Sequence, residues 1–201
     1  MAQSNLNSLS NFSIAQKFTA AAEGGLTDDP QDRGGITNYG VSLAFLTDLS
    51  HGSQADKHAL KDLGIDTAVN RQTIIRLTKN QAEGVFKYYF WDSLKLDELP
   101  LKMGCLIYDA AVNHGRIWGV KLAQRGYNKV YPNESLVVDG KLGPKSRAAL
   151  SSHDEACVHD AILDARNAYY DAIIKNRPSQ KVFERGWKNR VKRLRTYLLS
   201  L

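Results

Sequence analysis

The sequence predicts a mainly α-helical protein. Apolar residues recur at helical spacing in several segments, most clearly in 78–90, 101–114, 154–175 and 187–198. Strand-like alternation is scarce, so we expect at most a small hairpin around residues 34–41. The 201 residues, 43% of them hydrophobic and 24% charged, have an ordinary globular composition and can bury a substantial core.

The first helix is expected to end at Glu23. Ser13 and Gln16 fit a capping box at its start, and Gly24 supplies its stop. At a helix C-terminus the dipole disfavours a carboxylate and tends to raise its pKa. A carboxylic acid that stays protonated near neutral pH suits general acid catalysis, whereas the alternative is an exposed glutamate at a frayed helix end.

The segment that follows is dense in glycine and polar residues. Residues 23–40 read EGGLTDDPQDRGGITNYG. Two Gly-Gly pairs cost backbone entropy that an ordinary connection need not lose, so the segment is typical of a built site. Asp29 and Asp32 lie in its acidic turn, where either could take part in chemistry or brace the turn through local hydrogen bonds.

The central part of the chain predicts further helices. Ser42 fits the cap of a short helix, and Thr78 with Gln81 fits the capping box of a longer one with an aromatic core stripe and Trp91 at its rim. Between them the signal weakens, and we interpret 50–70 as a variable loop region with a short helix at 59–63.

Pro100 precedes a helix that is apolar on one side. Asp109 and Asn113 are four residues apart and share another side, which faces either solvent or a cleft. Gly143-Pro144 is typical of a helix start. In the terminal helix a stripe begun by Trp187 is surrounded by basic residues, whose default interpretation is a solvated face.

Several chemistries find no support in the sequence. Cys105 and Cys157 are far apart, so buried thiols are expected rather than a disulfide framework. The five histidines form no zinc-ligand spacing, and we predict no metal. The stretch GKLGPKS has Pro144 where a phosphate loop needs glycine, so nucleotide binding is not supported and no cofactor is expected.

The charge is concentrated in the second part of the chain. The net charge is +6 overall; residues 1–120 contain 11 Lys/Arg and 13 Asp/Glu, and residues 121–201 contain 16 and 8. A basic half favours an anionic polymer as partner, whether nucleic acid, a membrane surface or an anionic cell wall. No apolar run approaches the roughly 18 residues of a membrane span.

The glycine-rich segment and a second block resemble the glycoside hydrolase family 108 lysozymes, the N-acetylmuramidases of bacteria and phages. The first block matches E-G-G-(x)3-D-P-x-D-x-G-G-x-T-x-Y-G, and the second is YDAAVNHG at residues 108–115. The C-terminal part, with VDGKLGPKS at 138–146 and FERGWKNRV at 183–191, resembles the peptidoglycan-binding region that accompanies the family. Residues 48–70 look like a local insertion.

The resemblance implies a lysozyme-like helical fold and a set of site residues. Glu23 would be the catalytic acid, with Asp32 and Thr37 as further catalytic candidates, Asp32 stabilising the positive centre or orienting a water and Thr37 positioning the attacking water. The residues expected to bind substrate are Asp29, Tyr39, Asp109 and Asn113.

The expected function is cleavage of the β-1,4 bond between N-acetylmuramic acid and N-acetylglucosamine in peptidoglycan. The alternatives are a lytic transglycosylase on the same bond and a non-enzymatic cell-wall-binding or secretion-assisting module. We expect a polar tail at 1–11, a catalytic region at 12–120 and a peptidoglycan-binding-like region at 121–201.

The expected partner is peptidoglycan, with no nucleic acid and no stable membrane insertion, and the protein is expected to be a monomer. The first dozen residues lack the basic start and apolar run of a secretory signal. We therefore expect synthesis in the cytoplasm and action on the wall after release through a holin-type pore, as for phage endolysins, or another non-Sec secretion route.

Overall fold

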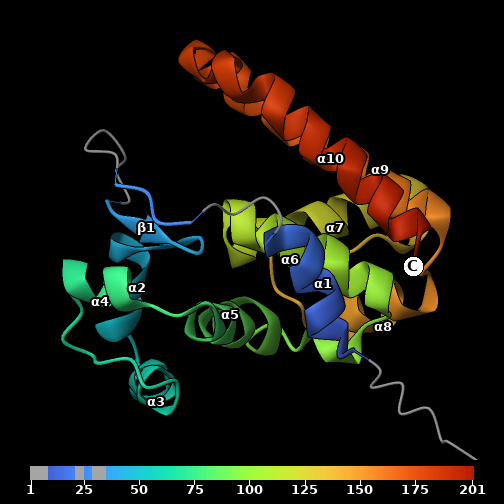
Figure 1. The fold of residues 1–201 in the computed structure, drawn as a ribbon. Coiled ribbons are helices and arrows are strands. Elements are labelled where there is room, and N and C mark those ends of the chain that lie inside the picture. The colour runs from blue at the N-terminus through green and yellow to red at the C-terminus, as the bar shows by residue number, and fades with distance from the viewer. Residues whose placement is uncertain (1–8, 21–24, 29–34) are drawn as a thin grey trace, which may run out of the picture. The chain divides into compact units, whose positions relative to one another are not determined.

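The computed structural model describes residues 9–20, 25–28 and 35–201, and it confirms a mainly α-helical fold (Figure 1). The chain divides into two compact units: unit 1, formed by residues 94–201 with the start of the chain up to residue 15, and unit 2, formed by residues 16–93. Within the described residues, no helix combines the length and apolar character that crossing a membrane requires.

Unit 2 contains a small hairpin and several short helices. The hairpin pairs β1 with β2 in antiparallel register, as expected from the sequence, with Thr37 opposite Ser42 and Asn38 opposite Val41. The elements are β1 (Thr37–Asn38), β2 (Val41–Ser42), α2 (Leu43–Ser50), α3 (Gln54–Asp62), α4 (Arg71–Arg76), α5 (Lys79–Phe86) and the π-helical turn η1 (Lys87–Asp92).

The caps of these helices follow the sequence closely. Ser42 Oγ accepts a hydrogen bond from the backbone N of Phe45 at 3.2 Å, and Thr78 with Gln81 forms the expected capping box. The region expected as a variable loop with a short helix at 59–63 contains the longer helix α3, which begins at a capping box of Ser53 and Asp56. This helix has little apolar character, and the cap and the buried Leu60 fix it.

The aromatic stripe of unit 2 is core, as expected. Phe45 lies 5.7 Å from Phe90 between ring centroids, and Phe86 lies 5.8 Å from Phe90. Trp91 was expected at the rim of this core but is 1% exposed. The π-helical turn changes the spacing of side chains around Trp91, which a regular 3.6-residue period does not anticipate.

Unit 1 is built from longer helices. They are α6 (Leu101–His114), α7 (Arg116–Val130), α8 (Pro144–Ser152), α9 (Ala156–Asn176) and α10 (Glu184–Leu199), with 3-10 turns η2 (Leu96–Glu98), η3 (Pro132–Glu134) and η4 (Pro178–Phe183). The expected apolar stripe of α6 is buried, and α6 packs on α7 and α9. This packing places α6 in unit 1, so the boundary between the compact units falls at residues 93 and 94.

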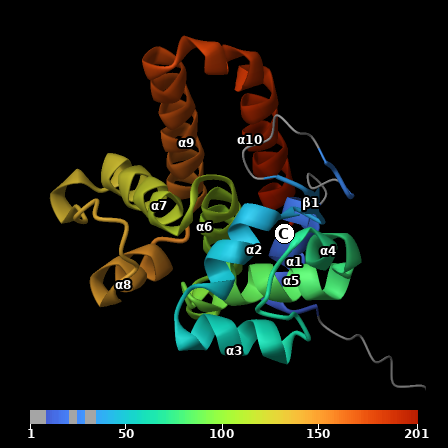
Figure 2. The ribbon, with the colours of Figure 1, turned by 90° about the vertical axis from the view of Figure 1, so that its left-hand side faces the viewer.

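The two long helices α9 and α10 pack against each other and are joined by η4 (Figure 2). Arg195 Nε donates to Asp160 Oδ1 at 2.7 Å, while the rings of Tyr170 and Trp187 stack at 4.8 Å, so the helices are antiparallel. On the other side of α9, Gly126 of α7 allows a close approach: a Cβ there would lie 2.5 Å from the backbone of Ile162.

Helix α1 (Asn11–Ala20) begins earlier than expected. The side chain of Ser10, not Ser13, accepts the capping hydrogen bond, from the backbone N of Ser13 at 3.2 Å. The start of α1 belongs to unit 1, where the ring of Phe12 meets Tyr108 edge-on at 5.8 Å. The expected end of this helix at Glu23 lies outside the described residues.

Candidate functional site

The most important predicted residue falls outside the part of the chain that the structure describes. Glu23, Asp29 and Asp32 all lie in its gaps. Their catalytic and substrate-binding roles therefore stay predictions from the sequence. The segments on either side are described, and they show how the surrounding loop is anchored.

Thr37 lies in β1, where the backbone makes contacts on both sides. Its N–H donates to the carbonyl of Thr27 at 2.9 Å, and its carbonyl accepts from the N–H of Thr27 at 2.8 Å. The half-buried Thr37 hydroxyl donates to the carbonyl of Gly35 at 3.3 Å, a long and therefore weak bond. The fixed backbone holds a hydroxyl that could re-orient towards a water or a substrate.

Tyr39 and Gly40 form the two-residue turn between β1 and β2. Both have positive φ, 49° and 78° respectively, as a type I′ hairpin turn requires. Glycine adopts this conformation freely, whereas tyrosine is strained by it. The turn presents the Tyr39 side chain, which is 40% exposed, at the hairpin tip. Strain at an exposed aromatic residue is common at ligand sites.

Asn38 anchors the hairpin to the rest of unit 2. Its side chain is 6% exposed, and its amide donates to the carbonyl of Ile74 at 3.0 Å and of Leu77 at 3.3 Å. Both carbonyls lie at the C-terminal end of α4, where the Ile74 carbonyl also accepts from the backbone N–H of the C-cap residue Leu77 at 3.2 Å. One side chain thus satisfies a helix end and fixes the turn that carries Tyr39.

A second anchor joins the described start of the loop to α4. The Arg71 guanidinium pairs with both carboxylate oxygens of Asp28, with Nη1 at 2.9 Å from Oδ1. The hydrogen bond from Arg71 lowers the pKa of Asp28, so this carboxylate stays ionised. Arg71 is the first residue of α4, and Asn70 caps that helix.

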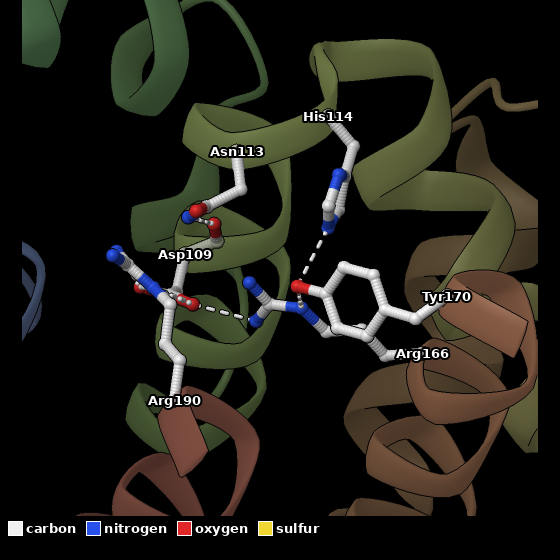
Figure 3. A network of polar contacts seen from close by, with 6 residues as sticks. All are labelled: Asp109, Asn113, His114, Arg166, Tyr170 and Arg190. Carbon is white, nitrogen blue, oxygen red and sulfur yellow. Dashed lines mark hydrogen bonds and ion pairs between the residues drawn. The ribbon is translucent and has the colours of Figure 1, made fainter. Parts of the chain in front are cut away.

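Asp109 lies at the centre of a buried ion-pair network in unit 1 (Figure 3). Its Oδ2 accepts from Arg166 Nη1 of α9 at 2.5 Å, and its Oδ1 accepts from Arg190 Nη2 of α10 at 2.6 Å. The network continues because Arg166 Nε donates to the Tyr170 hydroxyl at 3.0 Å, which lies 3.1 Å from His114 Nε2. It connects three helices at one point.

The network sets the protonation of its members. Burial would raise the pKa of Asp109, but the charges of Arg166 and Arg190 outweigh it and lower the pKa to about 2. For His114, burial lowers the pKa to about 3, and the nearby Arg166 adds to the effect. Because the Tyr170 oxygen accepts from Arg166, its hydrogen is free to donate to the neutral imidazole.

The two substrate-binding candidates on α6 therefore have different environments. Asp109 is 1% exposed with both oxygens paired, so in this structure it joins helices and has no surface for a sugar. Asn113 is exposed, and its amide donates to the carbonyl of Asp109 at 2.7 Å. Asn113 keeps its place among the substrate-binding candidates.

Arg190 corrects one expectation from the sequence. It was expected on a solvated basic face of the terminal helix, but it is 8% exposed and paired with Asp109. A signal was present, since Arg190 lies three residues after Trp187 and four before Leu194, on the apolar stripe of that helix. A charge on an apolar stripe generally requires a buried partner.

The thiols differ from each other. Cys105 is buried as expected, and burial raises the pKa of its thiol to about 12, so it is inert at neutral pH. Cys157, also expected to be buried, is exposed near the start of α9. Within the described ranges, no group of three or more His, Cys, Asp and Glu side chains is placed to hold a metal ion.

Two segments of the chain match known protein families. Residues 16–115 match the model of the family described as glycosyl hydrolase 108, and residues 118–192 match the family described as a predicted peptidoglycan domain. The chain belongs to the glycosyl hydrolase 108 family. As a member of this family it is a glycoside hydrolase that acts on peptidoglycan, and its second matched segment supports peptidoglycan as a partner.

A solved structure is similar to this family 108 protein over nearly its whole length. The structure of Brucella abortus SagA shares 26% sequence identity, covers 94% of each chain and superposes with a TM-score of 0.70. No curated protein sequence matches the chain. The structural likeness thus extends over both matched segments.

The Asp109 network connects the two segments that match protein families. All the predicted site residues lie in the glycosyl hydrolase 108 match, whereas Arg166 and Arg190 lie in the predicted peptidoglycan domain match. The ion pairs therefore bind α6 of the first segment to α9 and α10 of the second within unit 1. The sequence did not predict this contact, because Arg166 and Asp109 are far apart in the chain.

Proposed function

We propose that the protein is an N-acetylmuramidase that hydrolyses the β-1,4 bond between N-acetylmuramic acid and N-acetylglucosamine, with Glu23 as the general acid. The supporting observation is the match to the glycosyl hydrolase 108 model across residues 16–115, which contains the whole E-G-G to Y-G motif, together with the peptidoglycan domain match that follows.

In the proposed reaction Glu23 gives its proton to the glycosidic oxygen as the bond to the sugar carbon breaks. Positive charge develops on that carbon and its ring oxygen. Water adds to the carbon and releases a reducing sugar, and the proton lost by the water restores the acid form of the site. The reaction consumes one water and needs no cofactor.

The remaining candidates have proposed roles around this centre. Asp32 stabilises the positive centre or orients the water, and Asp29 contributes to substrate binding or braces the turn. Thr37 is suited to position the water because its hydroxyl makes one weak hydrogen bond to Gly35. Tyr39 and Asn113 are exposed and are proposed to contact sugars.

The test is the Glu23→Gln variant assayed on purified peptidoglycan. We expect normal folding and a loss of product release, since the amide cannot donate the required proton; loss of a general acid costs about 10²- to 10⁴-fold in rate. Glu134→Gln, a change of the same kind at an exposed position, serves as the control. Product release by Glu23→Gln at the wild-type rate would remove Glu23 from the mechanism.

The masses of the released fragments separate hydrolysis from the alternative lytic transglycosylase reaction. In that reaction a hydroxyl of the substrate attacks in place of water, and the anhydro-sugar product is one water lighter. A non-enzymatic wall-binding module would bind peptidoglycan and release no fragment of either mass.

A further inference from the structure

Unit 1 contains an open groove that none of the predicted site residues lines. Its walls come from α7, α9, α10 and the η4 turn, and its volume is about 820 Å³. Small-molecule sites commonly have volumes of about 300–1,000 Å³. The groove is thus large enough for one or two sugar rings with a substituent.

Aromatic rings form two of its walls. The rings of Trp118 on α7 and Tyr169 on α9 lie 4.3 Å apart between centroids, inclined by 31°. Trp187 on α10 also lines the groove, and its ring stacks on Tyr170 at 4.8 Å. Flat apolar faces next to polar groups are suited to the C–H faces of sugar rings, which carry hydroxyls only around their edges.

The floor of the groove comes from the apolar stripe that helical spacing predicts in residues 154–175. Val158 and Ile162 at the start of that α9 stripe are buried, but the later Ala165 and Tyr169 are half-exposed and line the groove. Ala168 and Ala172 complete a run of small side chains along one face of the helix. Because Trp118 and Tyr169 pack against each other, the space of the groove lies beside this pair of rings and next to the small side chains of the floor.

The rim is positive. Arg125 and Arg177 both line the groove and are exposed, and the Arg125 guanidinium lies 5.1 Å from the centroid of the Trp118 ring. The Lys121 ammonium lies 5.3 Å from the same centroid. Among the described residues that line the groove none is acidic. An anionic ligand would therefore find several cations beside an aromatic face.

The walls are held in place by the buried network of Figure 3. Tyr170, which stacks on the groove residue Trp187, is fixed through its hydroxyl by Arg166 and His114. The ring of His114 also meets Tyr169 edge-on at 5.3 Å. A site whose side chains are held before the ligand arrives loses less entropy on binding.

We propose that this groove is a second peptidoglycan-binding site, in which an N-acetylated sugar of the glycan strand stacks on Trp118 and the carboxylates of its peptide stem pair with Arg125 and Arg177. The inference rests on the proposed function in taking the same polymer as ligand. It assigns to the groove the task of holding the strand while cleavage occurs elsewhere in the chain.

The test measures binding in the absence of turnover. The full chain carrying Glu23→Gln is mixed with purified sacculi and sedimented, and it is titrated with a disaccharide-tetrapeptide, with neutral chitotriose and with the free tetrapeptide while tryptophan fluorescence is followed. We expect the disaccharide-tetrapeptide to bind most tightly and to change the fluorescence, because Trp118 and Trp187 line the groove.

In the same background, Trp118→Ala and Arg125→Glu should each weaken binding of the disaccharide-tetrapeptide by about tenfold or more, as expected for the loss of an aromatic anchor and for the reversal of a charge that pairs with the ligand. Arg125→Glu should leave chitotriose binding unchanged. The matched controls are Tyr131→Ala, another half-exposed aromatic, and Arg193→Glu, another exposed arginine, and both should bind as the parent does.

Parental binding by both Trp118→Ala and Arg125→Glu would overturn the proposal, as would tighter binding of duplex DNA or anionic vesicles than of sacculi through the same residues. If Trp118→Ala does not fold, Trp118→Phe and the exposed double variant Arg125→Glu/Arg177→Glu decide the question. Cleavage does not enter this measurement, so failure of the groove and failure of Glu23 as the acid are separate results.

Discussion

Arg190 and Asp109 form a buried ion pair between residues 81 positions apart in the chain, with Arg190 Nη2 at 2.6 Å from Asp109 Oδ1. Arg190 Nε adds contacts to both carboxylate oxygens at 3.2 and 3.3 Å. Together with Arg166 this pair joins α6, α9 and α10, so that the polar centre of unit 1 depends on one carboxylate.

Replacement of Asp109 should therefore destabilise the protein strongly. Asp109→Asn leaves two buried guanidinium groups without a counter-charge, and breaking a buried pair in this way typically costs about 3–5 kcal/mol. We expect that loss in the free energy of unfolding, measured by urea denaturation at neutral pH. Asp171→Asn, which removes an exposed ion pair to Lys188, should have little effect.

The loss should depend on pH in a defined direction. The pKa of Asp109 falls from 3.8 to about 2 on folding, so its ionised form stabilises the folded state above pH 3.8, and this contribution disappears as the pH falls through about 2. The wild type and Asp109→Asn should thus become more alike in stability at acid pH. A difference that stays constant down to pH 2 would contradict the ion-pair explanation.

His114 predicts a second pH effect. Its pKa falls from 6.5 to about 3 on folding, mainly through burial, so the unfolded chain binds one more proton than the folded chain between these values. Stability should therefore fall as the pH is lowered from about 6.5 towards 3. His114→Gln should reduce this slope, whereas His58→Gln on the exposed side of α3 should not.

A direct measurement can check the same residue. The ring resonances of His114 should show a neutral imidazole at pH 5 in an NMR titration. Titration of His114 near pH 6.5 in the folded protein would mean that water reaches the ring and that the network of Figure 3 is open in solution.

Periodicity and capping residues predicted much of the fold. The stripes of α6 and α10, the Ser42 cap of α2 and the Thr78 capping box all depend on residues within a few positions of one another. Helix α3 was predicted only in part, as a short helix at 59–63, because its stability depends on a cap and one buried leucine rather than on an apolar stripe. The start of α1 was misplaced because two serines compete as cap within four residues.

The site was harder to predict, because its contacts join distant parts of the chain. The four-residue spacing placed Asp109 and Asn113 on one side of the helix. In the structure α9 and α10 bury Asp109, whereas Asn113 stays exposed. The stripe of α9 continues past Ile162 with unchanged periodicity, yet its later members line a groove instead of the core. Helical spacing shows that a face is apolar; what covers the face depends on the tertiary structure.

Tyr39 should show opposite effects on stability and on activity. Tyr39→Gly removes a side chain from the left-handed region, so the free energy of unfolding should stay equal or rise by up to about 1 kcal/mol. If the exposed ring contacts a sugar, peptidoglycan cleavage should fall in the same variant. Urea denaturation and fragment release measure the two effects.

Two controls accompany this prediction. Gly40→Ala places a Cβ at φ 78°, so it should destabilise the hairpin by about 1–2 kcal/mol. Tyr39→Phe keeps the ring and its strain and tests the hydroxyl alone. Wild-type cleavage by Tyr39→Gly would show that the strained tyrosine has no part in substrate binding.

Asn38 should be more sensitive to a change of chemistry than to truncation. Asn38→Ala loses two hydrogen bonds and leaves the carbonyls of Ile74 and Leu77 without this donor, which should cost about 1–3 kcal/mol. Asn38→Asp keeps the shape of the side chain but places a carboxylate oxygen against the two carbonyl oxygens, so its loss of stability should be larger than that of Asn38→Ala. Equal losses in the two variants, measured by urea denaturation, would show that packing rather than the donated hydrogen bonds fixes the hairpin.

Gly126 and Gly186 should respond to the same substitution with opposite signs. A Cβ at Gly126 would lie 2.5 Å from the backbone of Ile162, so Gly126→Ala must push α7 away from α9 and should cost about 1–3 kcal/mol. At Gly186 in α10 no atom lies within 4 Å of the added Cβ, and alanine should stabilise the helix by up to about 1 kcal/mol. Thermal unfolding of the two variants compares them directly. Because alanine favours helices at both positions, a destabilised Gly126→Ala would measure the close approach of α7 and α9, and a stabilised one would show that the two helices can separate without loss.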